Sequence, residues 1–264
     1  MSAIEVRNLV KRYRGAARSA VDDVSFEAAE GELFCLLGPN GAGKTTTVSI
    51  LTTTLAPTSG VVRVADIDVV SDPSRVRREI GIVFQGPSLD PNLTAEENVR
   101  LHAVLYGLHP WRPSYRLMPS AYRRQVDELA DVLALEDHLG WPVRRLSGGT
   151  RRKLEILRAL LHHPRVLFLD EPTAGLDPET RHSLWHHLSL ARRGQGPTVC
   201  LTTHYLEEAE DADRVCVLAG GRVVELASPQ EMKRRHMDAE RAGLQPAVPT
   251  LEDTYLQLLA RAGR

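Results

Sequence analysis

The chain has 264 residues, of which 42% are hydrophobic and 25% are charged, and its formal net charge is −1. These proportions are those of a globular protein of one or two domains, and the charge gives no electrostatic reason to expect nucleic acid as a partner. No apolar run approaches the ~20 residues that span a bilayer, and the first residues lack the features of a signal peptide. We therefore expect a cytoplasmic chain that does not cross a membrane.

The first part of the chain is predicted to form strands. Short β-branched runs bounded by Gly or charged turns predict antiparallel strands of one small sheet over residues 4–10, 21–26 and 60–64. The run from Leu33 to Leu37 is apolar without alternation, as in a parallel strand that is buried on both faces.

Strands and helices then alternate. Residues 71–79 predict a helix and residues 81–85 the next strand. Residues 166–169 and 198–201 are again buried-strand runs, separated by a helix that Pro178 opens. Such alternation predicts a doubly wound parallel sheet. Three cysteines lie in predicted strands and are expected to be core thiols rather than disulfide or metal ligands, namely Cys35, Cys200 and Cys216.

A helical insertion interrupts the strands over about residues 90–150. Thr94 and Glu97 have the spacing of a capping box, and apolar residues at helical spacing follow from Leu101 to Leu108. A second amphipathic helix is predicted from about Ser120 to Leu135.

The last part of the chain contains a hairpin and a helical tail. Gly220-Gly221 separates two strand-like runs, and Ser228 is the expected cap of a following helix. We predict one domain over residues 3–232 and a C-terminal appendage over 233–264. The fold class is α/β, with a mixed and parallel sheet, an antiparallel β subdomain and an inserted α-helical subdomain.

A phosphate-binding loop follows the strand that ends at Leu37. Its pattern is G-x-x-x-x-G-K-T, and its nucleotide-binding candidates are Gly38, Pro39, Asn40, Gly41, Ala42, Gly43, Lys44, Thr45 and Thr46. Glycines let backbone N–H groups converge on an anion, and the following helix adds the partial positive charge of its N-terminus. Lys44 is expected on the β- and γ-phosphates of ATP, and Thr45 on Mg²⁺. The alternative is an ordinary Gly-rich turn.

Two acids end a later buried strand. Asp170 and Glu171 follow the run from Val166 to Leu169, and an acid at a strand's carboxyl edge beside a P-loop is placed to reach Mg²⁺. We assign Asp170 to the metal, directly or through water, and Glu171 to polarising the water that attacks the γ-phosphate. The alternative is a pair of solvated loop acids.

A third segment, Leu146-Ser147-Gly148-Gly149, precedes a helix that runs from Arg151 to Leu161. This segment resembles the signature motif of the ATP-binding cassette (ABC) family, and the P-loop and the two acids resemble further motifs of the same family. Further residues fall in the family's order: Tyr13 resembles the aromatic that stacks on adenine, Gln85 the Q-loop, Asp177 the D-loop and His204 the switch histidine. The resemblance covers residues 3 to about 232 and implies a P-loop NTPase core of RecA-like type.

The resemblance implies roles for these residues, and each has a plainer alternative. Gln85 binds Mg²⁺ or the attacking water, or only a loop backbone. His204 contacts the γ-phosphate, or is a satisfied core histidine. Tyr13 stacks on adenine, or packs in the core.

The resemblance also implies partners. In the family, Ser147, Gly148 and Gly149 would face the nucleotide of a second cassette, so two ATP molecules lie between two chains. This sequence has one P-loop and one signature, so a second polypeptide is required, and a homodimer is the simplest. ATP closes the sandwich and hydrolysis reopens it. A separate integral membrane permease would dock between Gln85 and the helical insertion and hold the chain at the cytoplasmic face of the membrane.

Finer similarity favours exporters of the daunorubicin and multidrug-resistance type, and one supporting stretch is the tail from Pro249 to Asp253. The alternative is a soluble ABC-type ATPase that acts in cofactor assembly or on nucleic acid or ribosomes. Two departures stand out. Thr150 replaces the usual Gln of the signature, and residues 109–122 are long for the family. That stretch is either an exposed aromatic loop that recognises the permease or a tolerated surface insertion.

Overall fold

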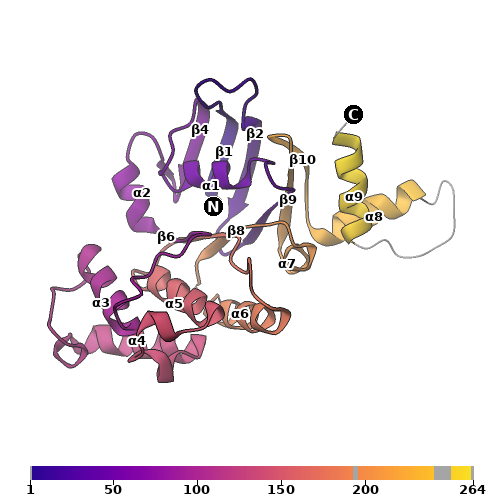
Figure 1. Cartoon of the computed structure of the whole chain (residues 1–264). Helices are drawn as coiled ribbons and strands as arrows, with labels where there is room; N and C mark the ends of the chain where they lie inside the picture. Colours follow the sequence, from indigo (N-terminus) through magenta and orange to yellow (C-terminus); the bar gives the residue numbers. More distant parts are fainter. Residues whose placement is uncertain (1, 193–195, 241–250, 263–264) are drawn as a thin grey trace. The chain divides into compact units, whose positions relative to one another are not determined.

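The computed structural model describes residues 2–192, 196–240 and 251–262 (Figure 1). The tail residues Pro249 and Thr250, which support the exporter subtype, lie outside the described residues. In the part of the chain that is described, no helix combines the length and apolar character needed to cross a membrane.

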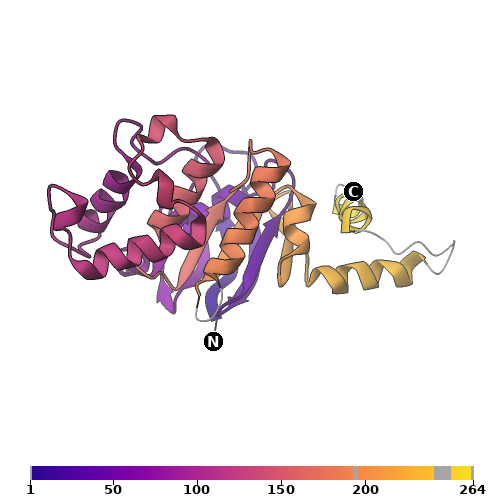
Figure 2. The same cartoon turned by 90° about the horizontal axis from the view of Figure 1, so that it is seen from below.

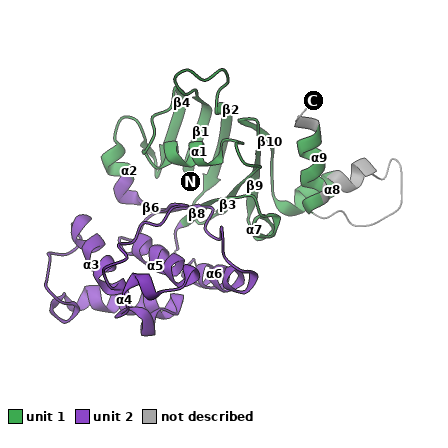
Figure 3. Ribbon diagram, viewed as in Figure 1, with its two compact units in different colours: residues 1–76, 198–264 green, residues 77–197 purple. Residues whose placement is uncertain are grey.

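The chain divides into two compact units (Figure 3). Unit 1 comprises residues 1–76 and 198–264, and unit 2 comprises residues 77–197. The division predicted from the sequence, a domain over 3–232 followed by an appendage over 233–264, stays a prediction.

Unit 1 contains the predicted antiparallel sheet. Its strands lie in the order β2-β1-β4-β5, with bounds β1 Ser2–Lys11, β2 Val21–Ala29, β4 Ser59–Val64 and β5 Ile67–Asp68. Side chains of β2 alternate between buried and exposed from Val24 onward, as expected of a sheet with one covered face.

A second group of strands in unit 1 carries the parallel pairing. Neighbouring strands follow the order β10-β9-β3-β8, and their bounds are β3 Leu33–Leu37, β8 Thr198–Thr203, β9 Arg214–Ala219 and β10 Arg222–Ala227. Strand β3 is parallel to both β8 and β9, and all five of its residues are buried. Strands β9 and β10 form the predicted antiparallel hairpin. The three cysteines are buried free thiols, as predicted.

The helices of unit 1 flank these strands. They are α1 Lys44–Leu51, α7 Leu206–Glu210, α8 Pro229–Glu240 and α9 Leu251–Ala262. Helix α7 packs on β3 and β8, and α9 packs on α7, α8 and β10. Ser228 caps α8 as predicted, because its Oγ accepts from Glu231 N and its N–H donates to the Glu231 carboxylate. Helix α2, Pro73–Glu79, spans the boundary between the units.

Unit 2 combines two parallel strands with α-helices and 3-10 helices. These helices are the magenta to orange coiled ribbons of Figure 2. Strand β6, Ile80–Val83, pairs with β7, Val166–Asp170. Its α-helices are α3 Ala95–Leu105, α4 Ser120–Leu133, α5 Gly148–Leu160 and α6 Pro178–Ala191, and its 3-10 helices are η1 Tyr115–Leu117, η2 Glu136–His138 and η3 Val143–Arg145. Helix α5 packs on β6 and also contacts α3, α4 and α6. The predicted capping box of Thr94 and Glu97 is present at the start of α3.

One expectation for unit 2 needs correction. Strand β6 ends at Val83, so Gln85 lies in a loop rather than at the end of a strand. The predicted helix is present as α3, and its last residue, Leu105, is 74% exposed, because helical periodicity shows that a face is apolar but not that anything covers it.

Residues 109–122, predicted as either a permease-recognising aromatic loop or a tolerated surface insertion, are exposed over much of their length. Trp111 is exposed, but Met118 and Tyr122 are buried. Tyr115 Oη donates to Asp127 Oδ1 over 2.6 Å, which ties this part of the stretch to α4, and both alternatives stay predictions.

Candidate functional site

The P-loop joins β3 to α1. Gly43 has a φ of 103°, a left-handed conformation that a side chain disfavours, and an added Cβ would lie 2.6 Å from the carbonyl oxygen of Ala20. Pro39, Asn40 and Gly41 are exposed. The predicted strand, loop and helix are therefore all in place, which argues against an ordinary Gly-rich turn.

Lys44 lies inside this loop. Lys44 is only 4% exposed, and its Nζ donates to the carbonyl oxygens of Gly38 (2.7 Å) and Pro39 (3.2 Å). Thr45, one position later, is exposed. The loop thus holds a cation at its centre and exposes a hydroxyl at the N-terminus of α1, an arrangement that suits an anionic ligand with a bound cation.

Tyr13 lies next to the P-loop helix. The residue is 45% exposed, and Oη is 3.3 Å from Thr46 Oγ1. The Nζ atom of Lys11 lies 5.5 Å from the ring centroid. Tyr13 is therefore not a core aromatic, and its ring is available to a flat ligand beside the phosphate loop.

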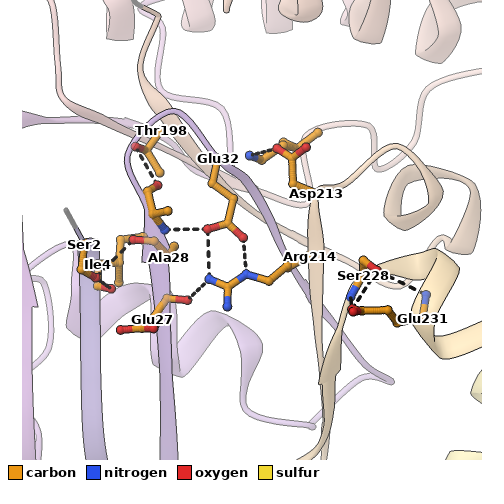
Figure 4. A network of polar contacts seen from close by, with 12 residues as sticks. Ser2, Ile4, Glu27, Ala28, Glu32, Thr198, Asp213, Arg214, Ser228 and Glu231 are labelled. Atoms are coloured by element: carbon orange, nitrogen blue, oxygen red, sulfur yellow. Dashed lines mark hydrogen bonds and ion pairs between the residues drawn. The ribbon is translucent and has the colours of Figure 1, made fainter. Parts of the chain in front are cut away.

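A polar network fixes the other end of β3 (Figure 4). The carboxylate of Glu32 accepts from Arg214 Nε (2.5 Å), Arg214 Nη2 (3.0 Å) and Ala29 N (2.5 Å). Asp213 Oδ2 accepts from Leu33 N over 2.7 Å. Hydrogen bonding to Glu32 raises the pKa of Arg214. These contacts tie β3 to β9 at the end opposite the P-loop.

His204 follows β8 in unit 1. It is half-buried, and its ring centroid lies 4.1 Å from that of Tyr205. Because β3 and β8 are parallel, His204 and the P-loop both follow the carboxyl ends of neighbouring strands.

Asp170 and Glu171 lie in unit 2, at the end of β7. Asp170 is the last, buried residue of the strand. Glu171 has a φ of 48°, a left-handed conformation that costs a non-glycine residue about 1–3 kcal/mol. Gln85 Nε2 donates to Glu171 Oε2 over 3.2 Å. These residues are therefore not simply solvated loop acids, and the structure brings Gln85 and Glu171 together.

Ser147 is the N-cap of α5. Its Oγ accepts from Thr150 N over 3.1 Å and lies 2.8 Å from Thr150 Oγ1. Ser147 and Gly148 are exposed, whereas Gly149 is buried. Thr150, the departure from the usual signature, therefore bonds the cap through its hydroxyl and leaves the exposed N-terminus of α5 intact.

Gly149 packs against the start of α6. An added Cβ would lie 2.1 Å from Thr180 Cγ2, so no larger residue fits without movement. Asp177 is the N-cap of α6 and accepts from Thr180 N (3.0 Å) and Thr180 Oγ1 (2.6 Å), and these hydrogen bonds lower the pKa of Asp177. The signature and Asp177 are thus joined through Thr180.

Sequence reasoning missed three residues of this region. They are Thr180, Arg152 and Glu155. The sequence held one signal for Arg152 and Glu155, because these opposite charges lie three positions apart on a helix that also buries leucines. The P-loop, Tyr13 and His204 belong to unit 1, whereas Gln85, Asp170, Glu171, the signature and Asp177 belong to unit 2.

Comparison with known proteins decides the family. A protein-family model described as "ABC transporter" matches residues 21–174, which is more than half of the chain. The chain belongs to the ABC transporter family. The ABC family membership predicted from the ordered motifs is confirmed, and the chain is an ATP-binding and ATP-hydrolysing cassette.

The curated relatives of this ABC ATPase include exporter subunits. It is 38% identical over 231 residues to Nod factor export ATP-binding protein I of Ralstonia nicotianae, covering 87% of this chain and 68% of the relative. It is 40% identical over 232 residues to the daunorubicin/doxorubicin resistance ATP-binding protein of Streptomyces peucetius, covering 88% and 67%. It is 34% identical over 258 residues to a probable multidrug ABC transporter ATP-binding protein of Escherichia coli K12, covering 98% of this chain and 42% of the relative.

Solved structures of ABC cassettes share the fold. One ATP-binding subunit of an ABC transporter superposes with a TM-score of 0.78 at 30% identity, covering 97% of this chain and 99% of that one. A dimeric cassette in a post-hydrolysis state, bound to ADP and Pi, has a TM-score of 0.73 at 29% identity, covering 85% and 98%. The predicted P-loop NTPase fold class is confirmed.

Proposed function

We propose that this chain is the ATPase subunit of an exporter, and that it powers the passage of a drug, antibiotic or other amphiphile through a separate membrane permease. The contact between Gln85 Nε2 and Glu171 Oε2 carries the mechanistic part of the proposal, because it joins two of the predicted catalytic side chains. The names of the exporter relatives support the cargo class.

ATP binding is assigned to unit 1. Tyr13 stacks on adenine, backbone N–H groups of the loop from Asn40 to Gly43 surround the phosphates, and Lys44 neutralises the β- and γ-phosphates. The carbonyl oxygens that Lys44 now contacts are its partners until a phosphate supplies stronger, charged acceptors.

Hydrolysis is assigned to four residues, namely Asp170, Glu171, Gln85 and His204. Glu171 takes the proton of the attacking water, Gln85 orients that water, and His204 holds the γ-phosphate. The hydroxyl of Thr45, the amide of Gln85 and the carboxylate of Asp170 are hard oxygen donors, so these residues fit Mg²⁺. The ion would neutralise the charge that develops on the phosphate oxygens.

Two copies, or this chain and a second cassette, would enclose each ATP. The exposed N-terminus of α5 with Ser147 and Gly148 has the hydrogen-bond donors to bind a γ-phosphate on another chain. ATP would therefore close the sandwich, and loss of the γ-phosphate would remove charge-assisted hydrogen bonds of about 1.5–3 kcal/mol each. The dimeric relative supports this arrangement.

The export proposal is tested with inverted membrane vesicles from which peripheral proteins have been stripped. Wild-type chain plus Mg-ATP is expected to bind the vesicles and restore uptake of a fluorescent anthracycline, whereas Glu171→Gln should bind without restoring uptake. ATP turnover with no vesicle binding and no uptake would contradict export and favour a soluble ATPase.

A further inference from the structure

The loop that carries Gln85 is held by a helix rather than by a strand partner. Residues 84–88 follow β6 and have no regular secondary structure. Arg152 of α5 donates through Nη1 to Phe84 O over 2.6 Å and through Nη2 to Gln85 O over 3.4 Å. One guanidinium therefore contacts the carbonyl oxygens of the two successive peptide groups that flank Gln85.

Two further side chains of α5 hold the end of the same loop. Glu155 Oε1 accepts from both N and Oγ of Ser88, each over 2.9 Å. Arg158 Nη1 donates to Ser88 O over 2.7 Å. Arg152, Glu155 and Arg158 are spaced three residues apart and so share one side of α5. We call these three residues the α5 clamp.

The clamp contains a buried ion pair. Arg152 Nη1 lies 2.8 Å from Glu155 Oε2, and the two residues are only 8% and 4% exposed. Burying two charges carries a desolvation penalty that their attraction often fails to offset, so stability alone does not explain the pair. What the pair supplies is a set of directed hydrogen bonds to a loop that borders a cavity of about 420 Å³.

The clamp connects two parts of the proposed site. Ser147 begins α5, and Arg152 lies five positions further along the same helix. Arg152 holds the backbone of Gln85, whose side chain contacts Glu171. We infer that Arg152 and Glu155 are positioning residues that fix Gln85 relative to the signature helix, so that Gln85 meets Glu171 only while α5 is in place. This inference rests on the catalytic roles proposed for Gln85 and Glu171.

A double-mutant cycle tests the inference in the full chain. Arg152→Met is made in wild type and in Gln85→Ala, and kcat and KM are measured for ATP together with the Mg²⁺ concentration for half-maximal rate. Arg152→Met is expected to lower kcat about tenfold or more, as small misplacements of catalytic groups do, with KM within about twofold. In the Gln85→Ala background it should cause little further loss, because its effect passes through Gln85.

Helix α3 offers a matched control. Arg100 pairs with Glu96 over 2.8 Å, both residues are buried, and Arg100 Nη1 donates to the carbonyl oxygen of Arg112 over 2.6 Å. This is the same chemistry away from the proposed catalytic residues. Arg100→Met is expected to keep the wild-type kcat. Backbone amides of residues 84–88 should exchange hydrogen faster in Arg152→Met but not in Arg100→Met.

The outcomes separate the inference from the proposed function. If Gln85→Ala lowers kcat while Arg152→Met keeps the wild-type kcat, the inference is overturned and the proposed function stands. The inference is also overturned if the kcat losses of the two single variants multiply in the double mutant. A wild-type kcat for Gln85→Ala overturns the role of Gln85 and the inference with it. If Arg152→Met does not fold, Arg152→Met/Glu155→Leu replaces it in the cycle, since apolar replacement of a buried pair is often tolerated.

Discussion

Gln85 Nε2 donates a hydrogen bond to Glu171 Oε2 over 3.2 Å. Gln85 follows β6 and Glu171 follows β7, and the parallel pairing of these strands brings both loops to the same edge. An amide N–H donates to a carboxylate oxygen without transferring its proton, so the contact fixes the direction of the Glu171 carboxylate. The contact therefore links the residue proposed to orient the water with the residue proposed to deprotonate it.

Lys44 is predicted to contribute most to phosphate binding. Lys44→Ala removes the buried cation of the P-loop and is expected to weaken ATP binding about 10- to 100-fold, since a charge-assisted hydrogen bond contributes about 1.5–3 kcal/mol. The dissociation constant of a fluorescent ATP analogue measures this. Lys233→Ala, which removes a surface ion pair with Glu210, is the control. Equal affinity in both variants would contradict the role of Lys44.

Tyr13 is predicted to bind the base through its ring. Tyr13→Phe should retain ATP affinity, whereas Tyr13→Ala should lose about 2- to 10-fold, corresponding to about 0.5–1.5 kcal/mol for an aromatic contact. Competition binding with ATP and GTP measures both, and Trp111→Ala serves as a control for loss of an exposed aromatic in unit 2. A Tyr13→Phe variant as weak as Tyr13→Ala would assign the effect to the hydroxyl near Thr46 instead.

Gly149 is predicted to be irreplaceable while Thr180 keeps its methyl group. Gly149→Ala forces a Cβ to within 2.1 Å of Thr180 Cγ2, and such overpacking costs about 1–3 kcal/mol of unfolding free energy. Thr180→Ser removes Cγ2 and keeps the hydroxyl that bonds Asp177, so Gly149→Ala/Thr180→Ser should regain stability and ATPase activity. Urea denaturation of the four chains measures this. No recovery in the double variant would show that Gly149 is required for another reason.

Much of this architecture is predictable because it depends on local pattern. The apolar run at β3, the capping box at Thr94 and the cap at Ser147 are properties of neighbouring residues, and the structure has all three. The exposure of Leu105 was not predictable, because an apolar helical face does not reveal what covers it. Arg152 and Glu155 were missed because their partners, Phe84 and Ser88, are more than sixty positions away and meet them only in the folded chain.

Acid is predicted to destabilise unit 2 through His102. Its ring lies 4.2 Å from that of Tyr106 and 6.0 Å from that of His162, and burial, with smaller effects of Arg158 and His162, lowers the pKa of His102 to about 3. Because this pKa is depressed below the unfolded value of about 6.5, the stabilisation is complete above pH 6.5 and is lost as pH falls toward 3.

The His102 prediction is measured by urea unfolding at pH 7.5, 6 and 5. His102→Phe keeps a ring and does not titrate, so its unfolding free energy should fall less steeply with acid than that of wild type. Carboxylates contribute equally to both chains, so the difference reports His102. Parallel pH profiles would contradict the prediction.

The proposed ATP sandwich is tested most directly by sizing Glu171→Gln with Mg-ATP and then with Mg-ADP, beside ATPase assays of wild type and variant. General-base removal typically costs about 10²- to 10⁴-fold, so the variant should lose turnover and hold unhydrolysed ATP. The predicted result is a dimer with Mg-ATP and a monomer with Mg-ADP. A monomer with both nucleotides, while the wild-type chain alone hydrolyses ATP, would contradict closure between two copies of this chain.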